Sequence, residues 1–133
     1  MLNYIVYEKL KNKYSKFQKL YDKTLKEKED LLSKAQLIIA KNDSNAFDKY
    51  LQTEKKINKV LNEMKNVLEE RRNMLNLKKE DLRNSKSFLD KIYTMRYIDH
   101  VSVRKIAQDQ YYSESQIYRI LGKIRNTTYD EDR

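Results

Sequence analysis

Polar and basic side chains gather near the C-terminal end of the chain in a pattern suited to reading a nucleic acid. On a helix that starts near residue 113, Gln116 and Arg119 share an outward face, and such side chains pair bidentately with adenine and guanine edges. Arg104 and Lys105 stand near the start of the preceding expected helix, where basic groups meet DNA phosphates. The candidate DNA-binding residues are Ser102, Arg104, Lys105, Ser113, Glu114, Ser115, Gln116, Tyr118, Arg119 and Lys123.

The apolar residues among these side chains have the spacing of two closely crossing helices. Ala107 supplies the small residue needed near the middle of the first helix, and Ile117 is placed to plug the second helix into it. Ser102 and Ser113 stand where each helix needs an N-cap oxygen. The expected core of this head is Phe88, Leu89, Ile92, Ile98, Val103, Ile106, Ala107, Tyr112, Ile117, Ile120, Leu121 and Ile124.

The composition argues against catalysis and against metal or thiol chemistry. The chain has no cysteine and a single histidine, His100, so thiolate sites and histidine metal sites are not expected. Glu69 and Glu70 beside Arg71 and Arg72 form a charged patch, but no nucleophile or glycine-rich phosphate loop accompanies it. We therefore expect neither an enzyme nor a cofactor.

The net charge favours a polyanionic partner. The 133 residues carry a formal charge of +9, and a basic protein concentrates on nucleic acid through counterion release. The aliphatic run at 37–40 is far shorter than the roughly 20 residues of a membrane span. We expect a cytoplasmic protein of a bacterial host, with no membrane partner.

The elements that must position the head are helices. With no proline and only one glycine, Gly122, the sequence lacks the turn residues that β folds need repeatedly. Apolar side chains at alternating steps of three and four predict a helix over residues 2–40, and a seven-residue leucine repeat predicts a second over 45–83. The cap-forming residues 41–45 place a turn between them. The expected fold class is all-α, a long antiparallel helical hairpin (coiled coil) followed by a trihelical helix-turn-helix head.

The second break in the pattern gives the expected domain boundary. Residues 84–87 indicate a helix stop and restart, with Ser87 and Asp90 at the spacing of a capping box. The hairpin is thus expected over 1–86, the head over 87–125 and an acidic tail over 126–133. Two helices cannot cover the whole apolar stripe of the hairpin, which predicts either packing on the head or a homodimer.

The stretch from Met95 to Arg125 resembles region 4 of sigma-70-type factors. The resemblance lies in an apolar-Arg-Tyr helix end, then Ser-x-x-x-Ile-Ala, a turn, and Ser-x-x-x-Ile. The Tyr-Arg-x-x-Gly-Lys ending at residues 118–123 is similar to small sigma-like regulators of Gram-positive phages and prophages, which include late-gene activators. Tyr111 stands where that family usually has glycine, so the turn is expected to be strained or lengthened.

These observations predict a sequence-specific DNA-binding transcriptional regulator, encoded by a phage or mobile element. Its partners would be double-stranded DNA, a second copy of the chain through the hairpin, and RNA polymerase. Two alternatives stay open. One is a coiled-coil interaction protein that inhibits a host factor without binding DNA, and the other is the DNA-recognition subunit of a phage packaging machine.

Overall fold

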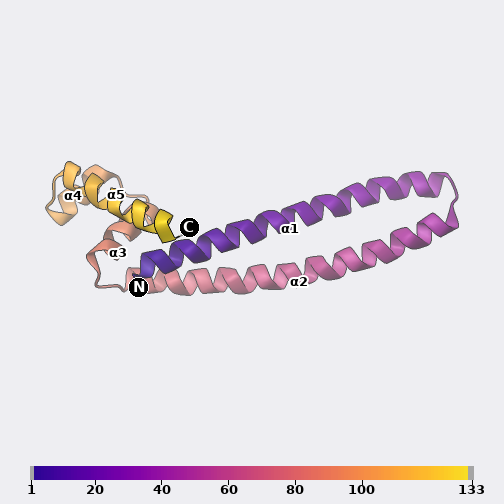
Figure 1. Ribbon diagram of the computed structural model, residues 1–133, viewed down its shortest axis with the longest axis horizontal. Coiled ribbons are helices and arrows are strands. Elements are labelled where there is room, and N and C mark those ends of the chain that lie inside the picture. The colour runs from indigo at the N-terminus through magenta and orange to yellow at the C-terminus, as the bar shows by residue number, and fades with distance from the viewer. Residues whose placement is uncertain (1, 132–133) are drawn as a thin grey trace. The chain divides into compact units, whose positions relative to one another are not determined.

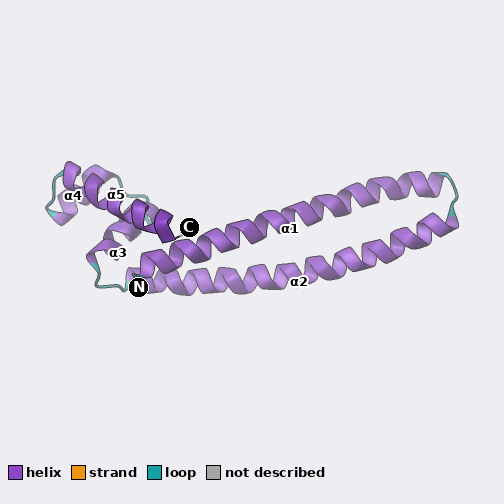
Figure 2. Ribbon diagram, viewed as in Figure 1, coloured by secondary structure: helices purple, strands orange, loops and turns teal. Residues whose placement is uncertain are grey.

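The structure is a computed structural model that describes residues 2–131, and within that range it is all-helical with no strand (Figure 2). The all-α class expected from the sequence is confirmed. The helices, labelled in Figure 1 apart from the π-helical turn η1, are α1 (Asn3–Ala40), α2 (Ser44–Arg83), α3 (Phe88–Tyr93), η1 (Thr94–Ile98), α4 (Val103–Gln110) and α5 (Glu114–Glu131).

The chain divides into two compact units. The described part of the first unit comprises residues 2–12 and 73–131, and the second unit is Lys13–Arg72. The expected boundary between residues 86 and 87 lies inside the first unit. Residues 126–131 of the expected acidic tail continue α5 as helix, and residues 132–133 lie outside the described range.

The first unit has one hydrophobic core drawn from both ends of the sequence. Its buried members come from every helix of the unit except η1, which contributes partly buried residues such as Met95, Tyr97 and Ile98. Side chains of α1 and α2 join a core that the sequence pattern had confined to residues 88–124. The buried core residues are Tyr4, Ile5, Leu82, Ile92, Tyr93, Val103, Ile106, Ala107, Ile117, Leu121 and Ile124.

A buried carboxylate ties the start of α1 to α3. Asp90 is 1% exposed, and its two oxygens accept hydrogen bonds from the Tyr4 backbone N–H at 2.9 Å and the Ser85 hydroxyl at 2.6 Å. The Ser87 side chain makes no capping bond, so the capping box expected from Ser87 and Asp90 does not form. Asp90 instead accepts the N–H of Tyr4, 86 positions earlier, which lies in the first turn of α1 and has no partner within that helix.

A cluster of tyrosines also joins the start of α1 to α3. The Tyr93 ring stacks on Tyr4 with 5.5 Å between ring centroids, and its hydroxyl donates a hydrogen bond to the Glu8 carboxylate. Burial, reinforced by the bond to Glu8, raises the pKa of Tyr93 well above its usual value. Burial also raises the pKa of Tyr7, whose ring meets Tyr93 edge-on. These phenols therefore stay protonated at neutral pH and can act as hydrogen-bond donors.

The second unit consists of residues 13–40 of α1 and residues 44–72 of α2, side by side and joined by the turn at residues 41–43 (Figure 1). The turn takes a left-handed conformation at Asn42, φ 54°, which asparagine tolerates well, and Asp43 caps α2 by accepting the Ala46 N–H at 3.1 Å. Between the two helices, Arg72 donates to the Tyr14 hydroxyl at 3.0 Å and Arg71 lies over the Phe17 ring. The buried residues of the second unit are only Ala35, Tyr50, Leu61 and Leu68.

Two classes of feature are missing from residues 2–131. None of the helices in that range is long and apolar enough to cross a membrane. The same range brings together no group of three or more histidine, cysteine, aspartate or glutamate side chains suited to a metal ion.

Candidate nucleic-acid interface

Helix α4 is short, and it is stabilised by an N-cap hydrogen bond and by a buried apolar face. The Ser102 hydroxyl accepts the Lys105 N–H at 3.2 Å, which is the N-cap bond that its position in the sequence predicts. Val103, Ile106 and Ala107 are buried, and the small side chain of Ala107 lets α5 approach. Arg104 and Lys105 are exposed, so the basic start of α4 is open to a ligand.

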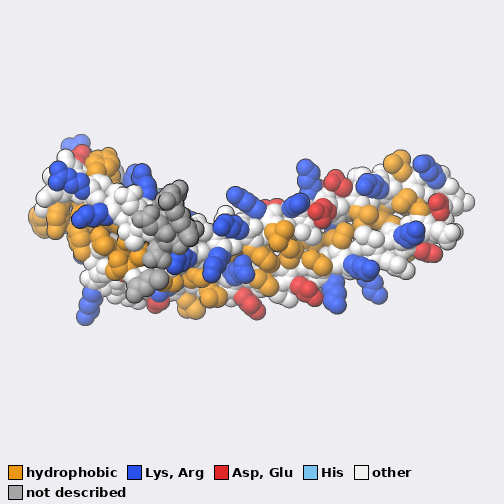
Figure 3. Space-filling model, in the orientation of Figure 1, with side chains coloured by type: hydrophobic (Ala, Val, Ile, Leu, Met, Phe, Trp, Pro, Cys, Tyr) orange, Lys and Arg blue, Asp and Glu red, His pale blue; other side chains and the backbone are white. Residues whose placement is uncertain are grey.

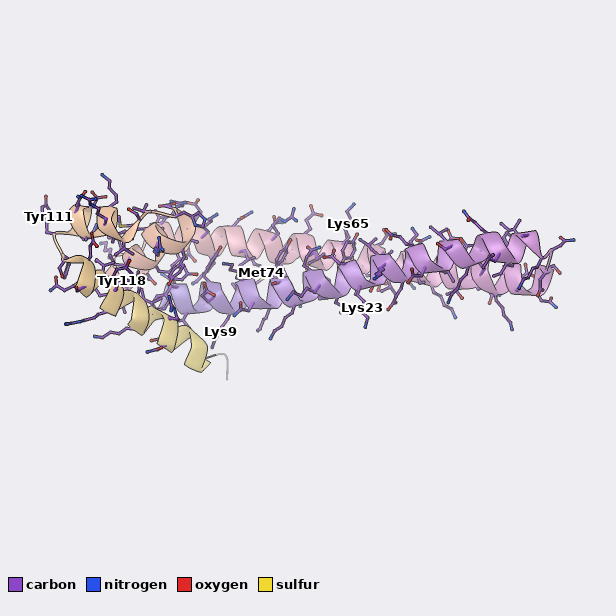
Figure 4. The ribbon with its side chains drawn as sticks, turned by 90° about the horizontal axis from the view of Figure 1, so that it is seen from above. Lys9, Lys23, Lys65, Met74, Tyr111 and Tyr118 are labelled. Atoms are coloured by element: carbon purple, nitrogen blue, oxygen red, sulfur yellow. The ribbon has the colours of Figure 1, made fainter. Side chains whose placement is uncertain are left out.

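The turn between α4 and α5 is made without glycine. Tyr111 closes α4 in the left-handed region, with φ 60° and ψ 40°, where a side chain other than glycine or asparagine is strained. Its ring is 96% exposed and projects from the outer end of the turn (Figure 4). The turn is thus strained, as its missing glycine predicts, and it carries an exposed aromatic group.

Helix α5 begins with a reciprocal pair of capping bonds. The Gln116 N–H donates to the Ser113 hydroxyl at 3.2 Å, and the Gln116 side-chain carbonyl accepts the Ser113 N–H at 2.9 Å. This is a capping box, in which glutamine takes the place of the usual glutamate. One of the two groups that Gln116 would present to adenine is therefore used within the protein, while its amide N–H donors remain.

The two faces of α5 differ sharply in polarity. Ile117, Leu121 and Ile124 are buried against α3 and α4, while Arg119 and Lys123 are exposed on the other side. Tyr118 of α5, labelled in Figure 4, is 62% exposed. Every candidate residue from the sequence is exposed: Ser102, Arg104, Lys105, Ser113, Glu114, Ser115, Gln116, Tyr118, Arg119 and Lys123.

The charge on this surface is mainly positive. Lys105 forms an exposed ion pair with Asp109, 3.6 Å between Nζ and the carboxylate, and such pairs dissociate readily in favour of a stronger anion. Glu114 lies in the first turn of α5, where its charge favours the helix N-terminus. Blue lysine and arginine side chains lie beside hydrophobic groups over the α4 and α5 region in Figure 3.

Arg96, Gly122 and Arg125, which lie beside this surface, were not predicted as site residues from the sequence. A hollow of about 220 Å³ is lined by Arg96, Tyr118, Gly122 and Arg125, among others. The Arg96 guanidinium donates to the Val101 carbonyl at 3.2 Å, which holds it at the edge of the hollow. Arg125 lies one turn beyond Gly122, so its i, i+3 spacing was the available signal.

Comparisons with protein-family models, curated proteins and solved structures give no match to this chain. The function of the protein is therefore inferred from its sequence and from the arrangement of its own residues.

Proposed function

We propose that this protein is a sequence-specific DNA-binding regulator that uses α4 and α5 as a helix-turn-helix. One observation carries the proposal: a buried row on α5 holds the helix against α4 while Arg119 and Lys123 face outward, uncovered. An α-helix with exposed arginine and glutamine fits the major groove of B-DNA and can read base edges there. The resemblance to region 4 of sigma-70-type factors and to small phage regulators supports the same proposal.

Because of the capping box, the two proposed base-reading residues, Gln116 and Arg119, differ in how freely they can contact a base. Gln116 uses its carbonyl oxygen on the Ser113 N–H at 2.9 Å, so bidentate pairing with adenine requires this bond to open. The exposed Arg119 projects from a fully formed turn of α5 and suits guanine O6 and N7. Arg119 is therefore the main proposed base reader, and Gln116 is a helix cap that also contributes an amide donor.

Helices α1 and α2 supply the proposed assembly surface as an antiparallel hairpin. In the second unit Leu20, Leu32, Leu51 and Val60 are between 42% and 48% exposed, and apolar groups of α1 and α2 reach the surface in Figure 3. Burying such side chains against a second copy stabilises a dimer through the hydrophobic effect. A homodimer would present two copies of α5 to DNA, and contact with RNA polymerase completes the proposed regulator.

A rival function has one observation in its favour. Leu37 and Ile39 are 63% and 62% exposed, next to an apolar hollow of about 370 Å³ lined by Ile38 and Phe47 at the α1–α2 turn. Such a surface suits a protein that captures another protein. In that case α4 and α5 would have a structural role only.

Titration of fluorescent duplexes with two variants separates base reading from simple charge attraction. Arg119→Ala should cost about 1–3 kcal/mol on a preferred duplex and much less on a random one. Lys105→Ala should weaken both duplexes alike and reduce the salt dependence by about one ion, because its proposed partner is a phosphate. Equal losses on both duplexes for both variants would leave only charge attraction and would favour the rival.

A further inference from the structure

The only glycine of the chain lies in an unexpected place. Gly122 stands inside α5, where glycine destabilises a helix relative to alanine. Its φ is not positive, and a Cβ added there would meet nothing within 4 Å. Neither backbone conformation nor internal packing therefore requires glycine, and the space above Gly122 is open to a molecule outside the chain.

That space is a groove with a cationic rim. The hollow of about 220 Å³ has Gly122 in its lining together with Arg96, Tyr118 and Arg125. Tyr118, Gly122 and Arg125 follow one another at i, i+4 and i+7 along one side of α5. Arg96 comes from η1 and is half-buried, and its bond to the Val101 carbonyl at 3.2 Å fixes the guanidinium while leaving other N–H donors.

We propose that this groove holds one phosphate of the DNA backbone, an inference that rests on the proposed function. Guanidinium groups bind phosphate oxygens through charge-assisted, often bidentate hydrogen bonds, and the Tyr118 hydroxyl supplies another donor. The missing side chain at Gly122 lets the sugar-phosphate backbone approach the helix closely. The groove then fixes the depth and rotation of α5 on the duplex, while Arg119 reads a base.

The test is a variant that stabilises the fold and weakens binding. Gly122→Ala should raise the melting temperature, since alanine favours the helix, yet it should lower DNA affinity about tenfold on preferred and random duplexes alike. Asn76→Ala is the matched control, because it also raises helix propensity at an exposed position but lies in α2, outside α4, α5 and the groove lining. It should leave DNA affinity unchanged.

Two further measurements identify the ligand. Arg125→Ala should flatten the salt dependence of DNA binding by about one ion. In NMR spectra of the full chain, duplex DNA should shift the Gly122 amide resonance, whereas millimolar inorganic phosphate alone should not. A saturable shift with inorganic phosphate and none with DNA would overturn the backbone assignment in favour of a free anion.

The failure of this inference can be told apart from failure of the proposed function. If Gly122→Ala binds DNA as tightly as the wild type while Arg119→Ala loses sequence preference, the groove assignment is wrong and the proposed function stands. If the wild type shows no preference for any duplex, the proposed function fails, and the groove assignment fails with it.

Discussion

The two units of this protein bury their apolar side chains in different ways. In the first unit, short helices cross around one core, in which Ile92, Ile106 and Ile117 are 0% exposed. In the second unit two long helices share a narrow seam, and its best buried apolar residue, Ala35, is still 5% exposed. The first unit is thus stabilised by side chains from several helices that pack around one core. The second unit is stabilised by repeated side-chain contacts between two helices.

Polar groups follow the same division. The first unit buries the Asp90 carboxylate and the Thr94 hydroxyl, each with a hydrogen-bond partner. In the second unit the polar contacts are exposed: the bond from Gln18 to Asp22 lies within one helix, and the bond from Arg72 to Tyr14 joins α1 and α2. Buried, satisfied polar groups favour one arrangement of a core over its competitors, whereas exposed pairs add little.

The largest expected effect is the loss of a core side chain from the first unit. Ile106→Ala should reduce the free energy of unfolding by about 3–4 kcal/mol, because the site is fully enclosed and leaves a cavity. Leu61→Ala in the second unit should cost only about 2 kcal/mol, since neighbouring groups on a two-helix seam can relax into the gap. Urea denaturation of both variants measures the difference, and equal losses would contradict the contrast between the units.

A smaller loss is expected from the buried carboxylate. Asp90→Ala should cost about 2–3 kcal/mol, because it leaves the Tyr4 N–H and the Ser85 hydroxyl without their acceptor. Asp81→Ala is the control, since Asp81 is exposed and its pairing with Lys78 at 3.7 Å contributes about 0.5 kcal/mol or less. Hydrogen exchange should also quicken at the first turn of α1 in Asp90→Ala alone. Unchanged exchange there would mean that Asp90 does not anchor α1.

The smallest expected effect has the opposite sign. Tyr111→Gly should stabilise the protein by about 0.5–1 kcal/mol, because relief of the left-handed strain outweighs the chain entropy of glycine. Gln108→Gly, inside α4, should destabilise by a similar amount. Thermal melting compares the two directly. A lower melting temperature for Tyr111→Gly would show that the tyrosine side chain stabilises the turn by more than the left-handed strain costs.

Local patterns predicted much of this structure. Three-four periodicity and the cap-forming residues after Ala40 place the long helices to within a residue or two of Asn3–Ala40 and Ser44–Arg83. The exposure of Gln116 and Arg119 also follows from helical spacing, because Ile117 and Leu121 fix the buried side of α5.

Contacts between distant segments could not be predicted in this way. The insertion of Tyr4 and Ile5 into the core of the first unit joins positions more than 80 residues apart, as the bond from the Tyr4 N–H to Asp90 shows. Ser87 and Asp90 had the spacing of a local capping box, but a distant helix end competed for the same carboxylate. The groove at Gly122 depends on Arg96 from another element, so periodicity within α5 could not reveal it.

The most direct test of the proposed function is selection from a pool of randomised DNA duplexes by the purified full-length chain, followed by sequencing of the retained fragments at near-physiological salt. We expect the wild type to enrich one short motif, and Arg119→Ala to lose that motif or to change it at one base position. Retained fragments as random as the input, bound in amounts that fall only with salt, would contradict base reading by α5.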